Sequence, residues 1–399
     1  MRLAVFLEQY EKGGVDTHLL NLITGWEAAE DSFDIYCNRE HKGLGLITEQ
    51  STGRACIVTY DSVAYDCVKR KLPKPLRFLL YPFFPFFFCL QYLQAKKLLR
   101  DKSYDVLLAD NGGYPGGWGV LASIIAARNL RIKRRTLLVH HAADPPRRLW
   151  GGFERAVDHA VARACTDIVA VSKATRETLI RHRRIASREA AIQVIYNSVS
   201  LASNANTDSD INLRRAYGID AEFLIGMVGR VEQYKGQEDL IKGFADVPPA
   251  LRDKMAVVII GGGADTEVER LRSLAATLGI IDRIHFTGFL NGDPKSLISQ
   301  LDLLVVLTRD FEGFGLTLGE AMAVDVPVLA TSVGAIPEFI DSNCGVLIPP
   351  ASPMHVTAAL AEFASEPAPW RERSNNARRV INSFSVEKMA RQFRNVFTR

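Results

Sequence analysis

The strongest constraint on the fold is a regular alternation of short apolar runs with longer segments of helical spacing. Short runs rich in branched side chains, each followed by glycine or a polar turn, are typical of buried parallel strands. The alternation therefore predicts parallel sheets covered by helices. The first half of the chain has such runs at Leu3–Leu7, Asp34–Cys37, Val106–Ala109, Thr136–Val139, Ile168–Val171 and Gln193–Tyr196. The second half has them at Phe223–Val228, Ala256–Ile260, Arg283–Thr287, Leu303–Leu307, Pro327–Ala330 and Gly345–Ile348.

A polar stretch of small and turn-forming residues, Ser198–Asp210, interrupts this alternation and is the predicted linker and hinge. The length of 399 residues, at roughly 100 to 200 residues per domain, suggests two domains, or three if one is small. We predict an α/β protein with two Rossmann-like, doubly wound parallel-sheet domains, 1–200 and 201–383, that face each other across a cleft. The last residues, about 384–399, are expected to form an amphipathic helix, and its packing against the first domain is left open.

The composition is that of an ordinary globular protein, with 47% hydrophobic and 24% charged residues, and it excludes disorder and a multi-span membrane protein. The six cysteines form no C-x-x-C pair and the histidines no H-E-x-x-H pattern, so we expect reduced thiols, a cytoplasmic location and no metal. The apolar start, residues 1–7, is shorter than a signal-peptide core of roughly 7 to 15 residues and is expected to be a strand.

Residues 78–93 (FLLYPFFPFFFCLQYL) are unusually rich in phenylalanine and are flanked by cations. The flanking cations are Lys69, Arg70, Lys71, Lys74, Arg77, Lys96, Lys97 and Arg100. With Pro82 and Pro85 inside, the segment should be a broken helix, too short for the roughly 20 residues that span a bilayer. An apolar wedge between cations favours peripheral contact with an anionic membrane. The alternative is a buried interdomain or acceptor-pocket segment.

A glycine-rich loop, 310–315, follows the apolar run Leu303–Leu307 and opens a helix. Glu312 lies in this loop and Glu320 lies about a turn into the helix, so both carboxylates can face a ligand at the helix start. The main-chain N–H groups near Phe314–Thr317 and the positive end of the helix could hold phosphate oxygens. The loop therefore suits a sugar phosphate, although a glycine-rich turn with a solvated glutamate is the structural alternative.

Two cations follow the first apolar run of the second half, in Gly229-Arg230-Val231 and Lys235-Gly236. The carboxyl ends of parallel strands are where ligands bind in open α/β sheets, and two cations there can neutralise a diphosphate. By itself, such a pair is more often a surface salt-bridge site.

Taken together, these motifs closely resemble the retaining family 4 glycosyltransferases, which have the GT-B fold. The resemblance rests on G-R-V-x₃-K-G (229–236), E-G-F-G-L-T-L-G-E-A-M-A (312–323) and V-P-V-L-A-T-S-V-G-A-I-P-E (326–338). The first half offers weaker matches in the order usual for the family, at Gly13-Gly14-Val15, Val171-Ser172-Lys173 and Val194-Ile195-Tyr196-Asn197.

The resemblance assigns roles to residues of the second half. It implies that Arg230 and Lys235 hold the diphosphate of a nucleotide sugar, that Glu312 contacts the hydroxyls of the donor sugar, and that Glu320 contacts the ribose. It also implies main-chain donor contacts from Phe314, Gly315, Leu316 and Thr317.

From the first half, the resemblance brings the Gly13-Gly14 turn towards the phosphates and a histidine towards the donor sugar. The histidine that directly follows the strand is His140, and His141 is the alternative candidate for this contact. Two departures from the family pattern are Asp325, where glycine is usual, and Ala335, which replaces the second glycine of a G-G-x-P-E turn.

The implied function is a retaining, metal-independent hexosyltransferase without a cofactor, which moves a sugar from a nucleotide diphosphate sugar to a glycan or lipid-linked glycan. The basic first half, with 29 Lys and Arg against 20 Asp and Glu, suggests polysaccharide or lipopolysaccharide assembly at the inner face of the plasma membrane. The alternatives are a nucleotide-sugar epimerase on the same fold and a non-catalytic nucleotide-sugar-binding scaffold.

Two other functions are disfavoured. Gly261-Gly262-Gly263 lacks the acid of a dinucleotide site at the end of the next strand. The basic clusters 128–135 and 181–184 lack the interleaved aromatics of a nucleic-acid surface, so no nucleic-acid partner is expected.

Overall fold

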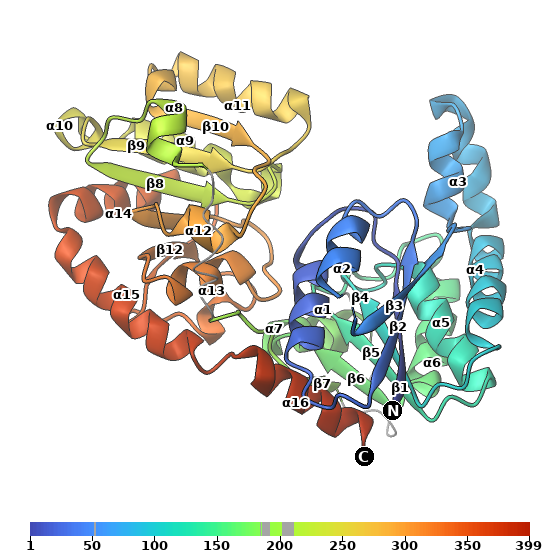
Figure 1. The fold of residues 1–399 in the computed structure, drawn as a ribbon. Coiled ribbons are helices and arrows are strands. Elements are labelled where there is room, and N and C mark those ends of the chain that lie inside the picture. The colour runs from blue at the N-terminus through green and yellow to red at the C-terminus, as the bar shows by residue number, and fades with distance from the viewer. Residues whose placement is uncertain (52, 184, 186–191, 202–210) are drawn as a thin grey trace. The chain divides into compact units, whose positions relative to one another are not determined.

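The computed structural model describes all residues except 52, 184, 186–191 and 202–210. Most of the expected linker, residues 202–210, therefore lies outside the described residues. The chain forms two compact units, one of Met1–Ser198 with Val386–Arg399 and one of Val199–Ser385 (Figure 1). Each unit has its own parallel sheet and its own core, as the alternation of strands and helices predicts.

The first unit contains a seven-stranded sheet in the order β3-β2-β1-β4-β5-β6-β7. Its strands are β1 (Arg2–Leu7), β2 (Ser32–Asn38), β3 (Ala55–Tyr60), β4 (Val106–Asn111), β5 (Arg134–Val139), β6 (Asp167–Ala170) and β7 (Ile192–Val194). The strand order reverses between β1 and β4. In doubly wound folds, ligands bind at such a point, beyond the carboxyl ends of the strands. The apolar runs predicted six of these strands. β3 has no counterpart among them, although its first four residues, Ala55–Val58, are apolar; this edge strand is only partly buried, and so short a run is a weak strand signal.

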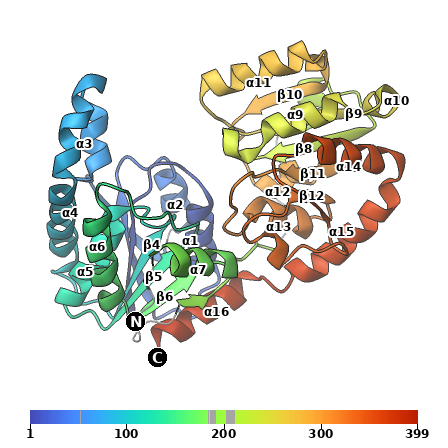
Figure 2. The same ribbon diagram turned by 180° about the vertical axis from the view of Figure 1, so that it is seen from behind.

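Helices cover both faces of this sheet, and the last helix of the chain belongs to this unit (Figure 2). Met389 and Phe393 of that helix, α16 (Val386–Phe397), are buried in one core with Leu19 of α1 (Gly14–Thr24). Gly25 allows the close approach, because a Cβ there would lie 2.4 Å from the carbonyl oxygen of Val386. The other helical segments are α2 (Leu44–Gln50), α3 (Tyr65–Lys71), η1 (Lys74–Phe83), α4 (Phe84–Leu99), α5 (Trp118–Asn129), α6 (Gly151–Ala164), α7 (Lys173–Thr178) and η2 (Leu179–Arg183).

The phenylalanine-rich segment is divided between inward and outward side chains. It is broken as predicted, since the 3₁₀ segment η1 ends at Phe83 and α4 begins at Phe84, with Pro85 in the first turn, where its missing N–H costs nothing. Phe84 and Phe87 are buried in an aromatic cluster with Tyr65, whereas Phe83 and Phe86 are 58% and 57% exposed. No helix within the described parts of the chain is long and apolar enough to cross a bilayer.

The second unit contains a six-stranded parallel sheet in the order β10-β9-β8-β11-β12-β13. Its strands are β8 (Phe223–Val228), β9 (Met255–Ile260), β10 (Ile284–Gly288), β11 (Leu303–Val306), β12 (Val328–Thr331) and β13 (Val346–Ile348), and all six follow the predicted runs. Its helical segments are α8 (Leu213–Tyr217), η3 (Gln233–Lys235), α9 (Gln237–Ala245), α10 (Pro249–Arg252), α11 (Asp265–Thr277), η4 (Ile281–Arg283), α12 (Pro294–Ile298), α13 (Leu316–Ala323), η5 (Ile336–Glu338), α14 (Pro353–Ser365) and α15 (Pro367–Ile381).

The backbone conformation differs at the two departures from the family pattern. Asp325 has φ of +58°, a left-handed conformation that favours glycine, and its carboxylate forms an ion pair with Arg378. Ala335 has φ of −81°, which any residue adopts, while Gly334 before it has φ of +54°. Only the first position of the Gly334-Ala335 turn therefore requires glycine.

Candidate functional site

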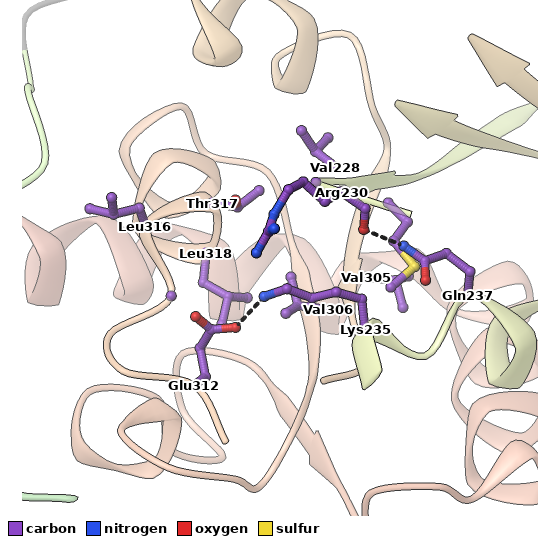
Figure 3. Close-up of a pocket in the computed structure, with 13 residues that line it drawn as sticks. Val228, Arg230, Lys235, Gln237, Val305, Val306, Glu312, Leu316, Thr317 and Leu318 are labelled. Atoms are coloured by element: carbon purple, nitrogen blue, oxygen red, sulfur yellow. Dashed lines mark hydrogen bonds and ion pairs between the residues drawn. The ribbon is translucent and has the colours of Figure 1, made fainter. Parts of the chain in front are cut away.

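A pocket in the second unit lies where β8 and β11 end and α13 begins (Figure 3). This is the edge at which a doubly wound sheet binds ligands. The pocket is lined by Met227, Val228, Gly229, Arg230, Lys235, Gln237, Val305, Val306, Glu312, Gly315, Leu316, Thr317 and Leu318. It thus brings together six of the predicted site residues: Arg230, Lys235, Glu312, Gly315, Leu316 and Thr317.

The two cations of the pocket differ in their surroundings. The guanidinium of Arg230 is about half exposed and pairs with Glu232 at 2.9 Å. The ammonium of Lys235 is largely covered and donates to Oε2 of Glu312 at 2.8 Å. Burial has the largest single effect and would lower the pKa of Lys235, but the charge of Glu312, its hydrogen bond and the neighbouring Tyr234 together raise the pKa. Lys235 therefore keeps a positive charge inside the pocket.

The carboxylate of Glu312 is held from several sides. Lys235 and the hydroxyl of Thr308 both donate to its Oε2, at 2.8 and 3.0 Å. Its main-chain carbonyl accepts from the N–H of Ala335 at 2.9 Å. Gly334 passes so close that a Cβ there would lie 2.2 Å from that carbonyl oxygen. The loop thus presents Glu312 in a defined orientation.

The first turn of α13 completes the pocket. Gly315 precedes the helix with φ of +85°, so the N–H groups of Leu316 and Thr317 lie at the positive end of the helix dipole. The ring of Phe314 lies in the core against Phe339. Phe314 can therefore contribute only main-chain groups, which is the role the resemblance implies for it.

Glu320, on α13, is not among the residues that line this pocket. Burial, and to a lesser extent the charge of Asp293, raises the pKa of Glu320 to about 8 against the opposing effect of Lys295. Its carboxyl group therefore holds its proton more readily than an ordinary glutamate, and the ribose contact remains a prediction.

The remaining predicted residues belong to the first unit. Gly13 begins α1 with an extended backbone, and its N–H donates to Oδ2 of Asp16 at 2.9 Å. A Cβ at Gly13 would meet nothing within 4 Å, so nothing within the unit requires glycine at this position. Asp16 is in turn paired with the buried His41 at 2.8 Å. Gly14, the first residue of the helix, is exposed and close to this group.

His140 follows β5 directly and is largely buried, whereas His141 is half-buried. Nε2 of His140 lies 2.7 Å from Oδ1 of Asp110 at the end of β4, and the carboxylate oxygen accepts a hydrogen bond from it. The ring of His18 packs edge-on against the ring of His140, with 4.7 Å between centroids. Neither Asp110 nor His18 was predicted from the sequence. An acid at the carboxyl end of a predicted strand was the available signal for Asp110, and nothing local indicated His18.

His18 is expected to make the protein acid-sensitive. Burial, and then the neighbouring His140, lowers the pKa of His18 from 6.5 to about 3. The unfolded chain takes up a proton on His18 near pH 6.5 while the folded protein does not, so stability is full above pH 6.5 and is lost as the pH falls towards 3. His18→Asn removes the protonation of His18 from the unfolding equilibrium. When the pH is lowered from 7 to 5, the unfolding free energy of this variant should therefore fall by about 2 kcal/mol less than that of the wild type. Urea unfolding at both pH values measures the difference, and an equal loss in the two proteins would contradict it.

Comparisons with known proteins agree with this fold. The family described as Glycosyltransferase Family 4 matches residues 12–203, and the family described as Glycosyl transferases group 1 matches residues 209–380. An uncharacterised glycosyltransferase of Methanocaldococcus jannaschii is 30% identical over 252 residues, which are 61% of this chain and 62% of the relative. The D-inositol 3-phosphate glycosyltransferase of Streptomyces avermitilis is 26% identical over 67% of this chain and 58% of its own. The matches thus span about three fifths of these relatives.

Among solved structures, Anabaena HepE in complex with UDP and glucose superimposes with a TM-score of 0.75 at 18% identity. The match covers 100% of this chain and 99% of that one, and at this identity it shows a common fold. Together the two family matches cover most of both units. The chain belongs to the glycosyltransferases of the family 4 type with the GT-B fold.

Proposed function

We propose that the protein transfers a sugar from a nucleotide diphosphate sugar to a glycan or lipid-linked glycan acceptor, with retention at the anomeric carbon and without a metal ion. The observation that carries the proposal is the convergence of Arg230, Lys235 and Glu312 on the start of α13 in one pocket (Figure 3). Cations beside a helix start suit a diphosphate, and a fixed carboxylate suits sugar hydroxyls.

The chemistry follows from where charge develops. As the bond between the sugar and the diphosphate breaks, negative charge grows on the leaving group and positive charge grows on the sugar ring. Arg230, Lys235 and the N-terminus of α13 would stabilise the leaving group more in the transition state than in the ground state. In the family pattern a phosphate oxygen of the leaving group takes the proton of the acceptor on the same face. Glu312 then orients the sugar and does not attack it.

The donor can be identified by stabilisation, because a ligand that binds only the folded protein raises its melting temperature. We would screen UDP-, GDP- and ADP-sugars, beginning with UDP-glucose because HepE binds UDP and glucose. The anomeric configuration of the product, determined by NMR in the presence of EDTA, tests both retention and metal independence. Stabilisation by no nucleotide sugar, or transfer that stops in EDTA, would contradict the proposal. Turnover of the donor without an acceptor would favour an epimerase, and binding without turnover would favour a scaffold.

The acceptor part of the proposal rests on the first unit, where helix α4 carries exposed apolar side chains at its start and cations at its end. Phe83 and Phe86 face solvent at the start of α4. Leu149, 80% exposed, is the chain neighbour of Trp150, whose ring packs against Tyr81 and Phe84. The exposed Lys96, Lys97 and Arg100 lie at the other end of α4. These features suit peripheral contact with the anionic inner face of the plasma membrane, where lipid-linked acceptors of polysaccharide or lipopolysaccharide assembly reside.

Vesicle co-sedimentation tests this contact. Phe83→Ser/Phe86→Ser should bind anionic vesicles several-fold more weakly than the wild type, since each buried aromatic ring contributes to membrane affinity. Met354→Ser, which alters a 72% exposed apolar residue of the second unit, is the matched control and should bind normally. The absence of vesicle binding by the wild type, or equal binding by the double variant, would contradict the membrane contact. Phe84 is unsuitable as a probe because it lies in the aromatic cluster.

A further inference from the structure

We infer that Thr308 is a positioning residue for Glu312: together with Lys235 it occupies one carboxylate oxygen, so that the other oxygen, Oε1, is the one presented to the donor sugar. This inference rests on the proposed function and specifies how the same site recognises the sugar.

Both donors to the Glu312 carboxylate meet the same oxygen. The Thr308 hydroxyl donates to Oε2 at 3.0 Å and the Lys235 ammonium donates to Oε2 at 2.8 Å. Two charge-assisted hydrogen bonds on one oxygen fix the rotation of the carboxylate as well as its position. Oε1 is left to accept a hydroxyl, the group that a sugar offers.

Thr308 is well placed to act in this way, because it is fully buried just beyond the end of β11. Its main-chain carbonyl accepts from the hydroxyl of Thr331, at the end of β12, at 2.6 Å. Its β-branched side chain has few χ1 rotamers, so the position of its hydroxyl group does not depend on Glu312.

The next residue, Arg309, fixes the start of the loop. Its guanidinium pairs with both carboxylate oxygens of Asp239 at 2.7 Å, and its N–H donates to the carbonyl of Tyr234, also at 2.7 Å. The hydroxyl of Thr308 therefore projects from a rigid part of the unit.

Lys235 and Thr308, the two hydrogen-bond donors to Glu312, should respond differently when a diphosphate binds. An ammonium has three N–H donors, so Lys235 can contact a phosphate oxygen while it remains beside Glu312. The phosphate nevertheless draws the lysine towards itself, and this weakens its hold on the carboxylate. Thr308 has no charge for the phosphate to attract and keeps Oε2 in place. A hydroxyl at this position thus separates sugar recognition from phosphate binding.

The test compares two variants of nearly equal size. Thr308→Val keeps the shape and removes the hydroxyl, and it should lower kcat/KM for the donor roughly 10- to 100-fold, the cost of one hydrogen bond to a charged group. Thr308→Ser keeps the hydroxyl and should stay within a few-fold of the wild type. The affinity for UDP alone, measured by calorimetry, should be unchanged in both variants, because Glu312 is assigned to the sugar and not to the nucleotide.

A second buried hydroxyl serves as the control for stability. Ser123→Ala removes another fully buried hydroxyl, which belongs to the first unit and donates to the main-chain carbonyl of Val120 at 2.7 Å. It should lower the melting temperature about as much as Thr308→Val does while keeping more of the activity.

Wild-type kcat/KM in Thr308→Val, equal losses in the valine and serine variants, or a loss of UDP affinity as large as the loss of activity would overturn the inference. If the wild type and Thr308→Val transfer sugar equally well, the role of Thr308 is refuted and the proposed function stands. A wild-type protein that neither binds nor transfers any nucleotide sugar refutes the proposed function.

Discussion

Replacing Lys235 by alanine is expected to lower kcat by roughly 10²- to 10³-fold, the usual cost of removing one group that stabilises charge in a transition state. Lys235 carries its charge within the pocket, because Glu312 and Tyr234 together raise its pKa by more than burial lowers it. The variant loses that charge where the leaving group becomes negative, and it also leaves the carboxylate of Glu312 without its ionic partner. Steady-state kinetics with the best donor from the nucleotide-sugar screen measures the change.

The control for this variant is another lysine of the same unit that forms an ion pair outside the pocket. Lys242 pairs with Glu238 at 2.6 Å on α9 and is exposed. Since exposed ion pairs contribute only about 0 to 1 kcal/mol, Lys242→Ala should keep both its stability and its activity. Similar kcat values for Lys235→Ala and Lys242→Ala would remove Lys235 from the mechanism.

The fold was largely predictable because its strands are buried on both faces. Such strands appear as continuous apolar runs, and this is why the runs Phe223–Val228 and Ala256–Ile260 coincide closely with β8 and β9. The edge strand β3, which is only partly buried, was not predicted, because its apolar run is limited to the four residues Ala55–Val58. The phenylalanine-rich segment shows a second limit. Composition marks it as unusual, but only the helix phase of α4 turns Phe84 and Phe87 inwards and Phe86 outwards.

The candidate site was predictable where its residues form local motifs. Arg230 and Lys235 lie in one short loop, and Glu312 lies in another loop that opens a helix, so each could be identified from its own neighbourhood. The contacts between motifs could not be predicted in this way. Which carboxylate oxygen of Glu312 accepts from Lys235 depends on side-chain rotamers, and the packing of His18 against His140 depends on a tertiary contact between residues more than 100 positions apart.

Gly261→Ala should be among the most damaging single-methyl changes in the second unit. Gly261 follows β9 with φ of +144°, and a Cβ there would lie 1.9 Å from the carbonyl oxygen of Gly229, which directly precedes Arg230. An alanine must bear both the backbone strain and this overlap, so we expect a loss of about 3 kcal/mol or more of unfolding free energy. Urea unfolding measures this loss.

Two other glycines separate strain from overlap. Gly279 has φ of +70° but open space around it, so Gly279→Ala should cost only the backbone term of roughly 1 to 2 kcal/mol. Gly262, next to Gly261, is not among the positive-φ glycines, and a Cβ there would have its nearest contact at 3.8 Å, so Gly262→Ala should cost little. A loss for Gly261→Ala no larger than that for Gly279→Ala would show that the neighbouring loop yields to the methyl group.

The activity of Gly261→Ala tests whether the packing of Gly261 against Gly229 matters for function. Its new methyl group can be accommodated only if the carbonyl of Gly229 moves, and Gly229 and Arg230 both line the pocket. The folded fraction of this variant should therefore show a lower kcat/KM at temperatures well below its melting point, whereas Gly279→Ala should lose stability and keep its activity. Normal kcat/KM in folded Gly261→Ala would mean that the position of the Gly229–Arg230 backbone does not matter for turnover, and the assignment of Arg230 to the diphosphate would lose its structural basis.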